Sequence, residues 1–266
     1  MGVRMNARLR KKAAVRLALV VAALTGAVSL VASGAAGEVV RVDNLEVFVD
    51  GGITPKKLPK KGQAPITLTV EGKIGTTDGS HVPALKTLDL QFDKAGSIYT
   101  KGLPTCTASK LQSTLTTQAK KACGSALVGT GRVSAEIAFP EQAPFDASGP
   151  LLIFNGKPKG GKPTLLFHVY AHVPAPTTFV TQAVISKTHG KYGTDALVQI
   201  PTIVGGQGSL TSFKATLHKT WTYKGQKKSL LLASCPRGVL YAHGDFKFAD
   251  GTLISGNISR PCTPGS

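Results

Sequence analysis

The rest of the chain is organised around the stretch CTASKLQSTLTTQAKKACGSALVGTG, residues 106–131. Two cysteines bracket the one segment with helical features, which predict a helix over about residues 107–122. Leu111, Leu115 and Ala119 fall on one face of that helix, and Gly124 provides its C-terminal stop. Because a helix this short is marginal alone, we expect a Cys106–Cys123 bond to tie its ends to neighbouring strands.

The rest of the chain has the two-residue period of half-buried strands. Leu88, Leu90 and Phe92, for example, alternate with polar residues. About a dozen such segments are separated by Gly-, Pro- and Lys-rich turns. We therefore expect an all-β fold, an antiparallel β-sandwich of roughly a dozen strands with one short disulfide-bracketed helix.

The N-terminus has the order of a secretory signal peptide. A basic segment containing Arg4 and Arg16 is followed by an apolar run over residues 17–32 and by small residues over 33–37. Residues 1–37 are thus a predicted leader, cleaved between Ser33 and Gly37. The alternative is an uncleaved membrane anchor, since residues 17–36 could just span a thin bilayer.

Residues 38–266 are predicted to form a single secreted β domain, long enough to bury a substantial core. Prolines cluster between Phe139 and Pro150, so two β subdomains divided near residues 140–150 remain an alternative. No second apolar run in this part approaches the length of a membrane span.

All four cysteines, Cys106, Cys123, Cys235 and Cys262, lie after the predicted leader. Export permits disulfides, and three pairings are possible. We favour Cys106–Cys123 with Cys235–Cys262, because each pair then encloses a self-contained unit. A zinc site is the competing interpretation, but no CxxC spacing occurs.

Two segments carry a resemblance to known proteins. The sequence ALVGTGRV at residues 126–133, after the first cysteine pair, and FKFADGT at 246–252, leading to RPC at 260–262, resemble uncharacterised secreted β proteins of high-GC Gram-positive bacteria. Those proteins have a leader, two cysteine pairs and no assigned activity. The resemblance implies export and a β fold, and it implies no function.

His168 and His172 invite a metal interpretation, but their segment is aromatic and β-branched and is predicted to be a strand. Four residues of strand separate two Cα atoms by about 13 Å, too far for one shared ion. We predict no metal and no cofactor. His168, Tyr170 and His172 instead form a candidate partner face.

Catalytic motifs are scarce. No GxSxG elbow occurs, and no serine can be chosen as the partner of His243 and Asp245. Oxidised cysteine pairs offer no thiolate. We therefore expect no enzymatic activity, with a cryptic hydrolase as the less favoured alternative.

Trp221 and Tyr223 could also stack on sugars as in a carbohydrate-binding module, although their alternation with polar residues favours a core role.

The net charge of the chain is +18, and its lysines gather in the segments that are expected to be loops. The candidate binding surface consists of Lys56, Lys57, Lys60, Lys61, Lys157, Lys159, Lys162, Lys224, Lys227 and Lys228. If these loops meet at one end of the fold, they attract anionic polymers or membrane faces. No base-stacking aromatics accompany them, so nucleic acid is not an expected partner.

The sequence thus predicts a secreted, non-catalytic binding or structural protein of the cell envelope or extracellular space. Its expected partners are an anionic envelope polymer, a membrane surface or another protein. The opposing interpretation of the lysines is plain solubility and protection of sheet edges.

Overall fold

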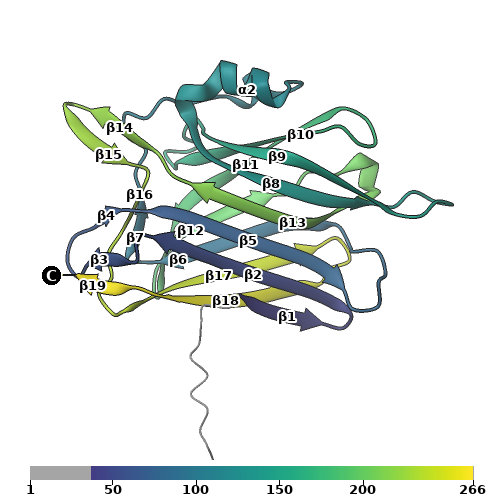
Figure 1. Ribbon diagram of the computed structural model, residues 1–266, viewed down its shortest axis with the longest axis horizontal. Helices are drawn as coiled ribbons and strands as arrows, with labels where there is room; N and C mark the ends of the chain where they lie inside the picture. Colours follow the sequence, from purple (N-terminus) through teal and green to yellow (C-terminus); the bar gives the residue numbers. More distant parts are fainter. Residues whose placement is uncertain (1–36, 266) are drawn as a thin grey trace, which may run out of the picture. The chain divides into compact units, whose positions relative to one another are not determined.

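The structure is a computed structural model that describes residues 37–265 (Figure 1). The predicted leader lies outside the described residues, apart from Gly37. Twelve of the strands form one antiparallel sheet. In spatial order they are β1 (Glu38–Val42), β2 (Leu45–Thr54), β5 (Thr67–Thr76), β13 (Gly208–Leu217), β8 (Leu127–Ile137), β9 (Phe145–Asn155), β10 (Thr164–Ala171), β11 (Thr177–Lys187), β12 (Tyr192–Gln199), β6 (Leu85–Asp93), β17 (Val239–Phe248) and β18 (Leu253–Pro261).

This sheet is nearly closed into a barrel, because its first and last strands come back beside each other. The Asn257 N–H on β18 donates to the Glu38 carboxylate on β1 at 2.6 Å. Arg260 on β18 reaches β2, where it pairs with Asp50 and donates to the Gly51 carbonyl. The all-β prediction is confirmed, whereas the two-sheet sandwich is wrong: these twelve strands form one curved sheet whose edges are joined by side chains.

The predicted alternation along the strands is what gives the barrel an inside and an outside. Leu88, Leu90 and Phe92 of β6 face the interior, while Asp89 lies on the outer face beside Asp245 of β17. Neighbouring strands place their own apolar residues on the same inner side. The largest cluster of buried apolar residues therefore lies on the inner side of the barrel.

The bracketed helical segment packs against the outside of the barrel, and its disulfide, Cys106–Cys123, is confirmed. It contains two short helices, α1 (Ala108–Leu111) and α2 (Thr116–Cys123), in place of the single helix predicted over 107–122. Leu111 and Ala119 are fully buried against Phe154 of β9, but Leu115 lies at the break and is 42% exposed. Gly124 is the C-terminal cap as predicted.

The break between the helices is explained by hydrogen bonds to the strands beneath. The Thr114 carbonyl accepts from His168 Nε2 at 3.0 Å and from the Thr178 hydroxyl at 3.0 Å. A continuous helix would commit that carbonyl to its own ladder and leave the buried imidazole without this acceptor. The barrel surface thus overrides the local helical periodicity.

The strand registers sort the connections between the twelve strands into two opposite ends. The pairs Thr54↔Thr67 and Leu217↔Leu68 place two connections together, and the other registers extend the assignment around the barrel. What we call the basic end carries residues 55–66, 94–126, 156–163, 188–191, 218–238 and 262–265. The hairpin end carries residues 43–44, 77–84, 138–144, 172–176, 200–207 and 249–252.

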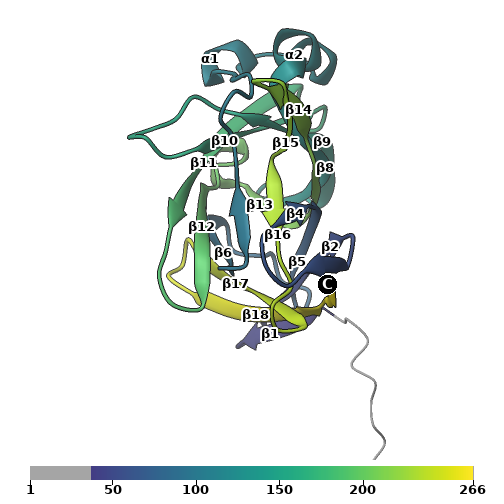
Figure 2. The ribbon, with the colours of Figure 1, turned by 90° about the vertical axis from the view of Figure 1, so that its left-hand side faces the viewer.

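Small elements cover the basic end, onto which Figure 2 looks. A three-stranded sheet has the order β4 (Ala64–Pro65), β16 (Leu231–Ala233), β7 (Gly96–Ile98). Beside it, β3 (Lys57–Pro59) pairs in parallel with β19 (Thr263–Gly265), and β14 (Thr220–Tyr223) forms a hairpin with β15 (Gln226–Ser229). The second predicted disulfide, Cys235–Cys262, is confirmed and packs here with Leu58 and Ile66.

The Pro-rich segment over 140–150 joins two strands of the same sheet. Strands β8 and β9 pair from Leu127↔Phe154 to Ile137↔Phe145, and the segment supplies the turn between them and the first part of β9. Among the described residues, no helix combines the length and the apolar composition that a bilayer span requires.

Candidate functional site

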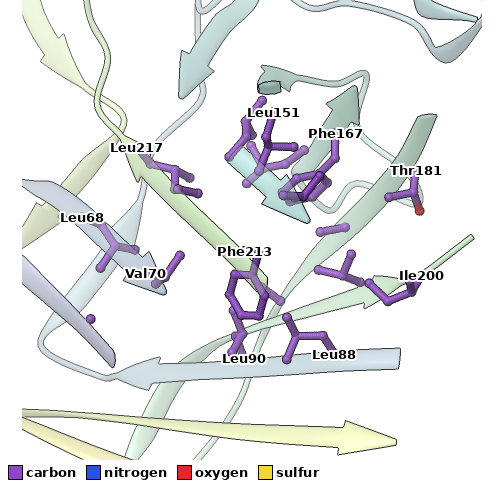
Figure 3. Close-up of a pocket in the computed structure, with 18 of the residues that line it drawn as sticks. Leu68, Val70, Leu88, Leu90, Leu151, Phe167, Thr181, Ile200, Phe213 and Leu217 are labelled. Atoms are coloured by element: carbon purple, nitrogen blue, oxygen red, sulfur yellow. The ribbon is translucent and has the colours of Figure 1, made fainter. Parts of the chain in front are cut away.

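The barrel encloses an apolar cavity of about 330 Å³ (Figure 3). Figure 3 shows Leu68 and Val70 of β5, Leu88 of β6, Leu151 of β9 and Phe213 of β13 around a shared space. An eight-stranded barrel is just wide enough for its side chains to fill, and the interior widens with strand number. Twelve strands therefore leave a space that these side chains do not close.

The lining is aliphatic and aromatic along nearly its whole length. Threonine hydroxyls are among its few polar groups, and one of them, that of Thr181, donates to the Gln199 carbonyl. Asp93 and Arg260 are the charged residues that line the cavity within the described part of the chain. The interior consequently offers dispersion contacts and few hydrogen-bonding groups to an occupant.

Both lining charges are paired with groups of the protein. The Asp93 carboxylate, 4% exposed, accepts from Arg237 Nη2 at 2.9 and 3.0 Å, and from the backbone N–H groups of Ala95 and Tyr241. Arg260 donates to the Gly51 carbonyl, the Ser259 carbonyl and the Asp50 carboxylate. They act as structural ties, and neither presents a free charge to the cavity.

The two ends of the cavity differ. At the basic end its wall includes Ile98 and Leu231, from the small sheet β4–β16–β7, and Figure 2 shows β16 lying in front of the barrel interior. At the hairpin end the lining continues onto Val173, Pro174 and Ile203, and Val173 is 48% exposed. We call this apolar rim at the hairpin end the mouth.

The structure brings the predicted lysine loops together. Lys56, Lys57, Lys60 and Lys61 lie in one connection of the basic end, and Lys157, Lys159 and Lys162 lie in a second. Lys224, Lys227 and Lys228 lie on the β14–β15 hairpin at the same end. Nine of these ten side chains belong to exposed residues, and Lys228 is half-buried, 5.8 Å from the Tyr99 ring centroid.

Charge is segregated between the two ends. Within the described residues, the connections of the basic end contain lysines and Arg237 but no Asp or Glu. Those of the hairpin end contain Asp43, Asp78, Glu141 and Asp250 but no Lys or Arg. The Asp78 pKa is lowered to about 2 by hydrogen bonds from the Ser80 backbone and hydroxyl and from Asn44, so this carboxylate stays charged.

The candidate partner face is only partly accessible. His168 is fully buried beneath the residues that link α1 and α2, and its Nδ1 has no hydrogen-bond partner among the described residues. Burial lowers the His168 pKa, which favours the neutral ring. Tyr170 is half-buried and His172 is exposed, and their rings meet edge to face at 4.7 Å.

Trp221 is packed against the protein on one side. Its ring stacks on Tyr99 with 5.9 Å between centroids and 17° between planes, and its Nε1–H donates to the Lys101 carbonyl at 3.2 Å. One ring face is thus already occupied. Tyr223 is half-buried and has Lys224 Nζ 5.9 Å from its ring centroid.

One serine has the hydrogen-bond order of a catalytic triad. The Ser209 hydroxyl lies 3.2 Å from His81 Nε2, and His81 Nδ1 contacts the Glu136 carboxylate. Ser209 is only 1% exposed, however, which denies a substrate carbonyl access to the hydroxyl. The triad order therefore lacks an accessible nucleophile.

The C-terminal histidine lacks even that order. His243 Nδ1 lies 2.9 Å from Asn257 Oδ1 and its Nε2 lies 3.1 Å from Asp245 Oδ1. The neighbouring Ser255 hydroxyl donates to Asp245 instead of to the imidazole. A base that does not contact the serine cannot activate it.

Asp89, Asp195 and Asp245 gather near His243 on the outer face of β12, β6 and β17. Burial, then the hydrogen bond and charge of Asp195, then the charge of Asp245, raise the Asp89 pKa to about 7. Asp89 Oδ1 and Asp195 Oδ1 are buried and accept no hydrogen bond. A proton shared by the two carboxyl groups would supply the missing donor. Among the described residues, no group of three or more His, Cys, Asp or Glu residues could hold a metal ion.

No family model, no curated protein and no solved structure matches the chain.

The cavity is the feature that sequence reasoning missed. The β-sandwich expected from the sequence would pack these apolar residues between two sheets and leave no such space. A signal did exist in the chain, since about a dozen long alternating strands make a sheet that can close around a space wider than its own side chains.

Proposed function

We propose that this protein is a non-catalytic binding protein that holds a small apolar molecule inside its barrel. The observation that carries the proposal is the apolar cavity of about 330 Å³ within the twelve-stranded sheet. This volume falls within the range of about 300–1,000 Å³ that small-molecule pockets occupy.

Water is a poor occupant of such a space. A cavity without polar partners stays dry and accepts apolar molecules, since a water inside it would lose its hydrogen bonds. The half-exposed residues of the mouth, Val173 among them, give an apolar molecule a path from the surface to the lining. Transfer of its surface out of water then supplies about 25 cal/mol per Å².

The test is a fluorescence titration with N-phenyl-1-naphthylamine, an uncharged apolar dye, on the purified protein with its disulfides intact. Ala196 lines the cavity from β12, so Ala196→Phe places a ring inside it. We expect saturable binding to the unaltered protein and at least about a tenfold weaker Kd for the variant.

Ala249→Phe is the matched control, because Ala249 is exposed on the β17–β18 turn and does not line the cavity. Circular dichroism and the Tm show that both variants fold. Equal dye binding by all three proteins, or no binding by the unaltered protein, would contradict the proposal.

A second candidate function is contact with an anionic envelope polymer through the basic end. The specific observation that favours it is the segregation of charge, with every lysine-rich connection at one end and no acidic residue in any of them. Lysines act as point charges, so such contact is loose and sensitive to salt. A bilayer is the less favoured surface, because Leu115 is the one strongly exposed large apolar residue that the described part of this end offers for insertion.

We also propose that the protein acts outside the cytoplasm. The two disulfides support it, since such bonds persist in oxidising compartments.

A further inference from the structure

The charges around the cavity restrict what kind of apolar molecule it can take. Arg260 is the cation of the described lining, and its guanidinium donors are directed to Gly51, Ser259 and Asp50. Its side chain is only 13% exposed. An incoming carboxylate or phosphate therefore meets in the cavity only a cation whose charge is already paired with Asp50.

The mouth offers no Lys or Arg to an anion either. In the described residues, none of the six connections of the hairpin end carries a Lys or Arg, and four of them carry one Asp or Glu each. Residues 172–176 and 200–207, which form the mouth, carry neither. Asp78 in particular is held in its charged form by Ser80 and Asn44, which lower its pKa to about 2. The lysines of the chain that could pair with an anion are concentrated at the opposite end, and none lines the cavity.

We propose that the ligand is an uncharged long-chain molecule, of the class of a fatty alcohol, a fatty ester or an isoprenoid, and that ionised fatty acids and anionic lipids are excluded. This inference rests on the proposed function, because it names the ligand of the same cavity. The Thr181 hydroxyl donates its hydrogen to the Gln199 carbonyl, and its oxygen can still accept a hydrogen bond from one neutral polar group.

The selectivity follows from desolvation. A buried carboxylate without a partner shifts its pKa upward by as much as about 3–5 units, so at pH 8 it must take up a proton to enter. An alcohol of equal chain length pays no such penalty. A pKa shift of about 2 units already corresponds to a hundredfold loss of affinity.

The experiment compares two ligands that differ only in the head group. Dodecan-1-ol and dodecanoate are each used at pH 8, below their aggregation limits, to displace N-phenyl-1-naphthylamine from the protein. We expect the alcohol to displace the dye and dodecanoate to bind about 100-fold more weakly. Equal binding of the two, or preference for dodecanoate, would overturn the inference.

A pair of variants tests the cause directly. Thr181 lines the cavity from β11, so Thr181→Lys introduces a cation there, and Thr181→Met introduces a side chain of similar length without charge. We expect the lysine variant to bind dodecanoate at least about tenfold more tightly than the methionine variant does. No difference between these two variants, when both are folded and bind the dye, contradicts the electrostatic cause.

The outcomes also separate the two proposals. If the dye binds and dodecan-1-ol fails to displace it, the ligand class is wrong while the apolar site stands. If neither the dye nor the alcohol binds to the unaltered protein, the proposed function fails, and this inference fails with it.

Discussion

Asp89 shows how a single side chain on the outer face couples the barrel to pH. It lies beside Asp245 in the β6–β17 register, and Asp195 of β12 lies close enough to raise its pKa. Its folded-state pKa of about 7 lies above its ordinary value of 3.8, so the folded protein binds an extra proton between these pH values. The stability that this carboxyl contributes is fully present below about pH 4 and is lost as the pH rises through 7.

Replacing that carboxyl by an amide should remove this dependence. We expect Asp89→Asn to be more stable than the unaltered protein at pH 8, by on the order of 1 kcal/mol after allowance for solvent screening. The measurement is urea unfolding between pH 4 and 8, with Asp146→Asn, a change at an exposed aspartate of β9, as control. A stability difference between Asp89→Asn and the unaltered protein that stays constant across this range would contradict the assignment.

At the scale of single elements, the helical segment shows where local pattern yields to tertiary contact. The spacing of Leu111, Leu115 and Ala119 predicted one continuous helix, and two of these three residues are indeed buried. Leu115, the third, lies in a break where the Thr114 carbonyl accepts hydrogen bonds from His168 and Thr178. The sequence of the segment does not predict this break, because the side chains that cause it belong to β10 and β11.

The connections of the basic end carry the second candidate function, and a charge-reversal pair tests it. Lys60→Glu/Lys61→Glu alters this end, whereas Lys86→Glu/Lys247→Glu changes the net charge equally on β6 and β17. All four lysines are exposed. We expect the first pair to weaken binding to heparin, used as a sulfated polymer, by at least about tenfold at low salt, since each lysine near an anionic surface contributes about 1 kcal/mol.

The second pair should change heparin binding much less, and high salt should abolish binding by every variant. Identical losses for the two pairs would mean that net charge alone governs the attraction. That result would favour the alternative interpretation, in which the lysines keep the protein soluble.

At the scale of the whole molecule, the sequence allowed the all-β class, the approximate number of strands and both disulfides to be predicted. Alternation such as that of Leu88, Leu90 and Phe92 identifies the buried face of each strand, and the cysteine spacing identifies self-contained units. Neither says which strands are neighbours. The meeting of β1 with β18 depends on contacts between residues about 220 positions apart, such as Glu38 and Asn257, and no local rule contains them.

The same limit applies to the candidate sites. The lysine loops could be identified from composition, but their convergence on one end required the registers of the strands. The cavity could not be derived from single strands, because it is a property of the closed sheet. A sandwich would bury these apolar side chains between two sheets, whereas this barrel arranges them around a cavity.

The central claim is that an apolar molecule occupies this interior, and the most direct measurement is to locate one there. Crystals of the protein soaked with 1-bromododecane can be measured at the bromine absorption edge. The account predicts an anomalous peak inside the barrel, among Leu88, Leu151 and Phe213. Bromine found only on the outer surface, or an interior filled with ordered water, would contradict it.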